Sequence, residues 1–274
     1  MTDQATRYDR IAGGYEEWWA PVLAPSALAL LDRLEGDIHA GARELLDVGV
    51  GTGNLSLPAL RRWPQIRVTA IDASREMVGA AERLLEERNP SARERFEGRV
   101  AHAAEMPFAD GSFDAAMSSF VLQLVPSRPK ALREINRVLR PGARFAHVTW
   151  LVDQRYFAPD RVFDQMLDEY GFEEPDDRTR SGDIPSVERA AAELRRAGFR
   201  NVTAERAILE HAFTVDGYIA FLTEFDEESL FEEMGRAERR RFLAEFRARL
   251  MALDPDDLSF RVPIVYASGV RGPA

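Results

Sequence analysis

One short run of residues combines an acidic side chain with closely spaced glycines, and this combination could hold a charged ligand. The run is Leu45–Asn54, in which Asp47 is followed at alternate positions by Gly49, Gly51 and Gly53. Glycine lets the chain turn tightly and leaves bare main chain for a ligand to lie against. The helix expected next can offer unpaired N–H groups to that ligand. The run therefore predicts a ligand-binding turn between a strand and a helix.

The spacing of these glycines helps to decide which ligand the turn binds. Dinucleotide-binding turns carry Gly-x-Gly-x-x-Gly, followed by an acidic residue about twenty positions later. Here the spacing is Gly-x-Gly-x-Gly, and Asn54 occupies the sixth position. A carboxylate at Asp47 would also sit poorly beside a pyrophosphate. A cationic ligand with an amino-acid portion, such as a sulfonium cofactor, suits an acidic turn better.

A second acidic residue, Asp72, ends the next apolar segment, twenty-five residues after Asp47. One carboxylate can accept hydrogen bonds from two neighbouring ribose hydroxyls, so Asp72 is a candidate ribose ligand. The alternative is that Asp72 caps the following helix, although Ser74 is already placed for that role.

These residues need a scaffold, and the chain predicts one in which strands and helices alternate. A helix is expected over Pro21–Leu34, ending before Gly36 and Gly41. Expected strands and helices then follow in this order: strand Glu44–Val48, helix Asn54–Arg62, strand Ile66–Ile71, helix Ser74–Asn89, strand Arg95–Val100, strand Phe113–Ser119, helix Pro129–Leu139 and strand Ala143–Trp150. This alternation favours a parallel sheet whose ligands bind at the carboxyl ends of the strands.

The pattern becomes less regular after Leu151. Expected elements are a helix over Arg161–Tyr170, an acidic loop over Glu173–Asp183, a helix over Ser186–Ala197, a strand over Asn201–Phe213, helices over Val215–Glu228 and Arg236–Leu253, and a strand over Leu258–Ser268. The helices between the last two strands form a late insertion with acidic and aromatic residues. Two roles are open for it: a cover over a pocket or a dimer contact.

Composition limits the classes of function. The 274 residues carry a formal net charge of −10, which disfavours a nucleic-acid partner. The arginines between positions 236 and 249 alternate with glutamates, as on a solvated helix face. The absence of cysteine excludes a thiol nucleophile and a cysteine-based zinc site. No apolar run approaches membrane-spanning length, so we expect a cytoplasmic protein, monomeric or homodimeric.

Further motifs, in order along the chain, carry a family resemblance. They are Val100–Phe108, Asp110–Asp114 and Leu139–Arg144, which follow the glycine loop and Asp72 at the expected separations. Over residues 5–150 this order resembles the small-molecule class I methyltransferases that use S-adenosylmethionine (SAM), in the group of quinone and biotin biosynthesis. The resemblance implies an α/β fold: a Rossmann-like, seven-stranded and mostly parallel sheet flanked by helices, with the last strand antiparallel. Three segments are then expected: an N-terminal helical lid (1–40), a SAM-binding core (41–150) and the remainder of the core with helical cap insertions at about 155–183 and 214–255 (151–274).

The resemblance also implies roles for individual residues. The three glycines approach the methionine and ribose portions of SAM, and Asp47 orients the loop or meets the amino group of the cofactor. The complete set of implied SAM-binding residues is Tyr15, Asp47, Gly49, Gly51, Gly53, Asp72, Ala73, Met77, His102, Ala103, Ser119, Phe120 and Gln123. His102 stands where the family often has aspartate, so its place at the adenine edge competes with that of a surface loop histidine.

The N-terminal run Tyr8–Trp19 resembles the family's mobile lid. Its aromatic rings could face the sulfonium, since cation–π attraction contributes roughly 0.5–2 kcal/mol. For Trp18 and Trp19 plain helix packing is an equal alternative, and Tyr15 is the preferred candidate.

The predicted reaction is methyl transfer from SAM to a small organic acceptor by in-line displacement, with S-adenosylhomocysteine as product and no metal. Candidate bases are Tyr15, His147, His211 and acidic residues of the insertion, and none is assigned. Two rivals are a SAM-binding regulator or partner protein without transfer activity and a nicotinamide-dependent oxidoreductase. The oxidoreductase is disfavoured by the glycine spacing and by the single lysine, Lys130.

Overall fold

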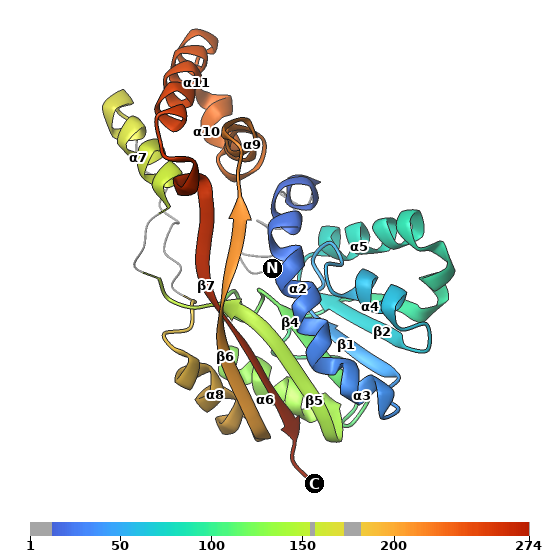
Figure 1. The fold of residues 1–274 in the computed structure, drawn as a ribbon. Helices are drawn as coiled ribbons and strands as arrows, with labels where there is room; N and C mark the ends of the chain where they lie inside the picture. Colours follow the sequence, from blue (N-terminus) through green and yellow to red (C-terminus); the bar gives the residue numbers. More distant parts are fainter. Residues whose placement is uncertain (1–12, 154–156, 173–181, 274) are drawn as a thin grey trace. The chain divides into compact units, whose positions relative to one another are not determined.

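The computed structural model describes residues 13–153, 157–172 and 182–273. Within these residues one seven-stranded sheet has the order β3-β2-β1-β4-β5-β7-β6 (Figure 1). Its strands are β1 (Glu44–Val48), β2 (Arg67–Asp72), β3 (Phe96–Val100), β4 (Phe113–Ser119), β5 (Leu139–Trp150), β6 (Phe199–Ala212) and β7 (Ser259–Arg271). The pairs from β3 to β5 are parallel, and β7 is antiparallel to β5. The predicted fold class is confirmed.

Helices flank the sheet. Helix α2 contacts β4 and β5 and passes in front of the sheet in Figure 1, whereas α6 contacts β5 from behind. The helices are α2 (Ala20–Leu31), α3 (Glu35–His39), α4 (Ser56–Arg62), α5 (Arg75–Arg88), α6 (Arg128–Val138), α7 (Ala158–Tyr170), α8 (Val187–Arg196), α9 (Val215–Phe221), α10 (Glu228–Glu233) and α11 (Arg236–Met251). Shorter turns complete them: the π-helices η1 (Tyr15–Trp19) and η4 (Leu222–Asp226) and the 3₁₀ turns η2 (Asp32–Leu34), η3 (Pro90–Arg95) and η5 (Pro255–Leu258).

The core of the sheet is built from the apolar runs that the sequence shows. Leu45, Leu46, Val48 and Ile71 are at most 1% exposed. A parallel sheet covered on both faces needs such runs on each central strand. Ser74 caps α5, because its hydroxyl accepts a hydrogen bond from the Met77 N–H at 3.1 Å.

Several predicted boundaries differ from the structure. The N-terminal helical region continues past Gly36 and ends at His39, two residues before Gly41, whose φ is +114°. Helix α4 begins at Ser56 rather than Asn54, since the Asn54 side chain donates to the Ala20 carbonyl instead of capping the helix. Strand β5 begins at Leu139, and its pairing with β4 shifts register between Phe113 and Ala115. The three residues between the predicted helix end at Leu139 and the predicted strand start at Ala143 therefore belong to one bulged strand.

The chain forms two compact units. Among the described residues, the first holds 13–152, 182–207 and 263–273, and it contains β1 to β5. The second holds 153, 157–172 and 208–262. The first twelve residues, with the start of the predicted lid, and residues 173–181 of the predicted acidic loop lie outside the described residues. The role of the late insertion, cover or dimer contact, stays a prediction.

The second unit packs around aromatic side chains. Phe163 is fully buried and its ring lies 5.5–6.0 Å from those of Phe231, Phe242 and Phe246. These rings come from α7, α10 and α11, so they join the predicted insertion helices into one small core.

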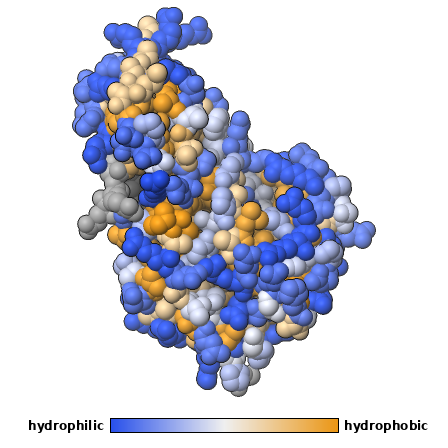
Figure 2. Space-filling view, viewed as in Figure 1, coloured by the Kyte–Doolittle hydropathy of each residue, from blue (hydrophilic) through white to orange (hydrophobic). Residues whose placement is uncertain are grey.

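Hydrophilic residues cover most of the face shown in Figure 2, and apolar residues gather in small patches. None of the described helices combines the length and the apolar character that crossing a membrane requires.

Candidate functional site

A pocket opens in the first unit at the carboxyl ends of β1, β2 and β4. The structure brings eleven of the thirteen predicted site residues to its wall: Tyr15, Asp47, Gly49, Gly51, Asp72, Ala73, Met77, His102, Ala103, Ser119 and Phe120. These residues come from five separate segments of the chain. The strand ends therefore position the site as the alternating pattern predicts.

The glycine loop turns sharply between β1 and α4. Gly49, Gly51 and Gly53 have φ values of +79°, +52° and +94°, a region that side-chain-bearing residues rarely adopt. The Gly49 and Val50 N–H groups donate to the Ile71 carbonyl at 2.8 and 2.9 Å, which ties the loop to β2. A Cβ at Gly51 would meet nothing nearer than the Tyr15 ring, at 4.0 Å. Gly51 thus leaves open space beside the pocket.

Asp47 presents a buried carboxylate to the pocket. It is 1% exposed, and its Oδ2 accepts a hydrogen bond from the Ser56 hydroxyl at 2.6 Å. Its Oδ1 is buried and has no hydrogen-bond partner among the described residues. Burial raises the pKa of Asp47 to about 7, against the opposing effect of the Ser56 hydrogen bond. A buried acceptor without a partner fits a ligand that brings a donor to Oδ1.

Asp72 is held in one orientation by main-chain donors. The Gly51 N–H donates to its Oδ2 at 2.9 Å, and the Ser74 N–H donates to its Oδ1 at 3.0 Å. Each of the two carboxylate oxygens thus accepts one of these main-chain hydrogen bonds. Asp72 therefore both braces the glycine loop and lines the pocket.

The segment after β3 forms one wall of the pocket and is held by main-chain hydrogen bonds. The Ala101 N–H donates to the Asp72 carbonyl at 2.9 Å, and the Glu105 N–H donates to the His102 carbonyl at 3.0 Å. His102 itself is exposed to solvent and lies at the pocket rim.

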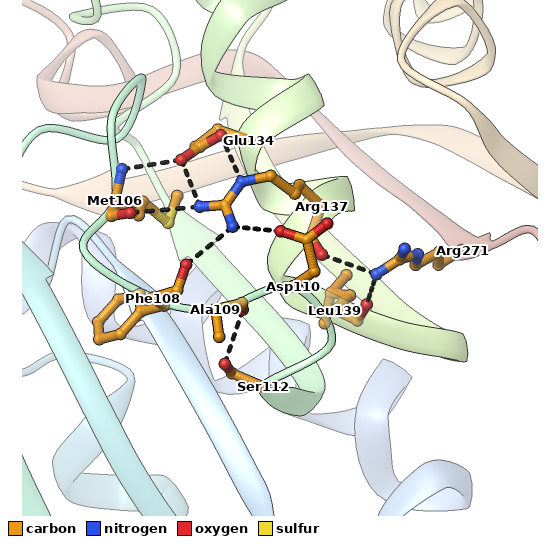
Figure 3. Close-up of polar contacts among 9 residues, drawn as sticks. All are labelled: Met106, Phe108, Ala109, Asp110, Ser112, Glu134, Arg137, Leu139 and Arg271. Carbon is orange, nitrogen blue, oxygen red and sulfur yellow. Dashed lines mark hydrogen bonds and ion pairs between the residues drawn. The ribbon is translucent and has the colours of Figure 1, made fainter. Parts of the chain in front are cut away.

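Arg137 on α6 uses all five of its N–H donors, three of them on the rest of this segment (Figure 3). It donates to both carboxylate oxygens of Glu134, to the carbonyls of Met106 and Phe108, and to the Asp110 carboxylate, at 2.6–3.2 Å. Glu134 also accepts from the Met106 N–H at 3.0 Å. The hydrogen bonds with Arg137 lower the pKa of Glu134.

Two predicted residues lie elsewhere. Gly53 lines a neighbouring groove, where a Cβ would come within 2.3 Å of the Leu57 side chain, so this glycine serves close packing. Gln123 is not among the residues that line the pocket. Its side chain donates to the Phe120 carbonyl and accepts from the Thr149 hydroxyl, both at 2.6 Å.

The histidines considered as bases do not line the pocket. His147 is 2% exposed, stacks on Phe145 and has an unpartnered Nδ1 among the described residues. Burial lowers its pKa to about 3 and keeps it neutral. His211 belongs to the second unit, where its ring meets Phe213 edge-on. Trp18 does not line the pocket, and Trp19 lies 6.3 Å from Trp150, in line with packing.

The residues of the pocket wall that the sequence did not predict are mainly apolar. The missed residues are Leu23, Val50, Thr52, Asn54, Leu55, Ile71, Ala101, Ala104, Val121, Leu124, Val125 and Pro126. For those between positions 121 and 126, the sequence signal that could have identified them is their place directly after β4.

The sheet order, the glycine loop and the acidic residues Asp47 and Asp72 define an α/β protein with a ligand pocket at the carboxyl ends of its strands. A family model described as a methyltransferase domain matches residues 46–147. A ubiquinone/menaquinone biosynthesis C-methyltransferase, UbiE, from Paracoccus denitrificans is 30% identical over 214 residues, covering 72% of this chain and 80% of the relative. The chain belongs to the class I SAM-dependent methyltransferases.

Other relatives differ in name and in coverage. UbiE from Dinoroseobacter shibae is 34% identical over 148 residues, and the chain spans only about half (54%) of its length. A malonyl-[acyl-carrier protein] O-methyltransferase from Methylococcus capsulatus is 31% identical over 217 residues, covering 68% of this chain and 76% of the relative. The relatives thus include both C- and O-methyltransferases.

Solved structures share the fold. Haemonchus contortus phosphoethanolamine N-methyltransferase 2, solved with S-adenosylhomocysteine, has a TM-score of 0.53 at 19% identity, covering 91% of this chain and 53% of that chain. The [4+2]-cyclase SpnF has a TM-score of 0.52 at 24% identity, covering 85% and 77%. The fold alone therefore does not decide the reaction.

Proposed function

We propose that this protein transfers a methyl group from SAM to a small organic acceptor by in-line displacement, leaving S-adenosylhomocysteine. The observation that carries the proposal is the pair of carboxylates at one pocket, Asp47 with a free buried oxygen and Asp72 braced by two N–H groups. SAM supplies an amino group and a ribose that match these acceptors. The family membership supports the same donor.

Each carboxylate has a distinct partner in this proposal. Asp47 Oδ1 accepts from the amino group of SAM, which also brings a positive charge to a buried carboxylate. Asp72, held by its two main-chain donors, accepts from the two ribose hydroxyls. The open space at Gly51 lets the donor approach the main chain.

The remaining wall residues complete the donor site. Met77 flanks the adenine, and the segment at His102 and Ala103 meets its edge. Tyr15 and Phe120 bring aromatic rings to the wall, and the Ser119 main chain lies at the methionine portion. Positioning of donor and acceptor within about 3–3.5 Å in line contributes much of the rate of such a displacement.

The acceptor is an apolar organic molecule in our proposal. Most wall residues not assigned to the donor are apolar, among them Leu23, Leu55, Leu124, Val125 and Pro126, and the exceptions are Thr52 and Asn54. Such a mainly apolar wall favours an apolar acceptor. The names of the relatives include both a C-methyltransferase and an O-methyltransferase, so both carbon and oxygen stay candidates for the methylated atom.

Calorimetric titration with SAM, S-adenosylhomocysteine and NAD tests the donor. We expect binding of the first two and none of NAD; tight NAD binding without SAM binding overturns the proposal. Transfer of a labelled methyl group to a panel of quinols, phenols and carboxylic acids tests the reaction. A protein that binds SAM but methylates nothing in a wide panel would match the rival, a SAM-binding protein without transfer activity.

A further inference from the structure

Phe120, the first residue after β4, has an unusual backbone conformation. Its φ is +54°, in the left-handed region that is unfavourable for a residue with a bulky side chain. Among the described non-glycine residues only Asn201 shares a positive φ. Strained residues of this kind persist only where their surroundings hold them, and they concentrate at functional sites.

Strand β5 holds this conformation from both sides of the residue. The Phe120 N–H donates to the Val148 carbonyl at 2.9 Å. The Phe120 carbonyl accepts from Gln123 Nε2 at 2.6 Å, and Gln123 Oε1 accepts from the Thr149 hydroxyl at 2.6 Å. Both ends of the Gln123 amide are therefore engaged within the protein, which explains why this side chain does not line the pocket.

The result of this arrangement is a fixed aromatic wall. The Phe120 side chain is 5% exposed, lines the pocket and packs 4.3 Å from the Trp150 ring. Within the described part of the chain, Phe120 and Tyr15 are the aromatic residues that line this pocket. An aromatic face attracts a cation and has no such attraction for a neutral group.

We propose that the Phe120 ring lies against the sulfonium of SAM and discriminates the charged donor from its neutral product, and that Gln123 and Thr149 are positioning residues that set this ring. The inference rests on the proposed function, because it requires SAM in the pocket. SAM carries a positive sulfur, whereas S-adenosylhomocysteine carries a neutral thioether. The ring therefore stabilises bound donor more than bound product and favours product release.

The ratio of the affinities for SAM and S-adenosylhomocysteine is the direct measurement. Phe120→Leu removes the aromatic face but keeps an apolar side chain. We expect it to weaken SAM binding by about 2- to 30-fold, the range of a cation–π contact, and to change product binding less than about 2-fold. Phe120→Tyr keeps the aromatic ring and should keep the ratio of the two affinities. This control separates loss of the aromatic face from general damage to the fold.

The positioning role of Thr149 is tested by an isosteric change. Thr149→Val removes the hydroxyl that holds Gln123 and should lower the ratio in the same direction, and Thr149→Ser should restore it. Thr203→Val is the matched control, since Thr203 makes one side-chain hydrogen bond in the same sheet, to Ser268 at 2.9 Å, away from the pocket. It should leave the ratio unchanged.

Two results overturn the inference. Equal losses of SAM and product affinity in Phe120→Leu would show that the ring packs without meeting the sulfonium. An unchanged ratio in Thr149→Val would remove the positioning role. If the unaltered protein binds neither ligand, the proposed function fails instead, and the two failures are thus distinguishable.

Discussion

Asp47 should make SAM binding depend on pH. Burial raises its pKa to about 7, so most molecules without ligand carry a neutral Asp47 at pH 5.5. A cationic amino group at Oδ1 needs the ionised form. With a pKa of about 7 the ionised fraction rises from about 0.03 at pH 5.5 to about 0.5 at pH 7.0. Affinity should therefore rise by about 15-fold, or roughly 1.6 kcal/mol, because it scales with the competent fraction.

Calorimetry with S-adenosylhomocysteine measures this effect without turnover. Titrations between pH 5.5 and 7.0 keep the amino group of the ligand protonated. Repeating them in two buffers of different ionisation enthalpy gives the number of protons released. We expect about one proton per ligand at pH 5.5 and about half a proton at pH 7.0.

Two variants test whether the proton released on ligand binding comes from Asp47. Asp47→Asn should bind more weakly and lose the pH dependence. Ser56→Ala removes the hydrogen bond that lowers the pKa of Asp47, so the affinity profile should move to higher pH. Affinity that is flat with pH, with no proton release in the unaltered protein, would refute the reasoning, as would an Asp47→Asn variant that keeps the slope.

Further predictions concern the same site and its supports. Asp72→Ala should weaken SAM binding by roughly 1.5–3 kcal/mol through lost charged hydrogen bonds, and unchanged affinity in calorimetry contradicts the ribose role. Gly51→Ala should lower SAM affinity, and its φ of +52° should lower Tm modestly, whereas Gly49→Ala, whose Cβ would also lie 2.2 Å from a valine side chain, should lower Tm more. Arg137→Lys cannot replace five donors and should reduce the free energy of unfolding by about 2–3 kcal/mol in urea titrations; a loss below about 0.5 kcal/mol would show that the network in Figure 3 adds little stability. In the folded protein the pKa of His147 is about 3, below its unfolded value. Protonation therefore favours the unfolded state, and His147 lowers the free energy of unfolding as pH falls from 6.5. The His147→Leu variant should lose less of this free energy than the unaltered protein between pH 7 and pH 5.

The sequence predicts local features of the site well, because short-range spacing determines them. Gly49 and Gly51 adopt the positive φ values that their spacing indicates, and Asp72 ends a strand beside them. The Ser74 cap likewise depends on neighbours a few residues away.

Features that depend on tertiary contacts could not be read from the sequence. The hydrogen bond between Gln123 and Thr149 joins the loop after β4 to β5, and no local sequence pattern predicts it. The same holds for the bulge near Pro141, because the sequence predicts a strand only from Ala143 whereas β5 begins at Leu139. The raised pKa of Asp47 arises from burial by the whole first unit.

The pairing of β5 with β7 has a consequence for the order of folding. Arg144 pairs with Val270 and Trp150 with Ile264, so each partner is synthesised more than one hundred residues after β5. During that interval one edge of β5 lacks its native neighbour and exposes unpaired N–H and C=O groups. Such long-range pairing slows folding, and an open strand edge invites pairing with another chain. The nascent chain is therefore most prone to aggregation after β5 emerges and before β7 arrives.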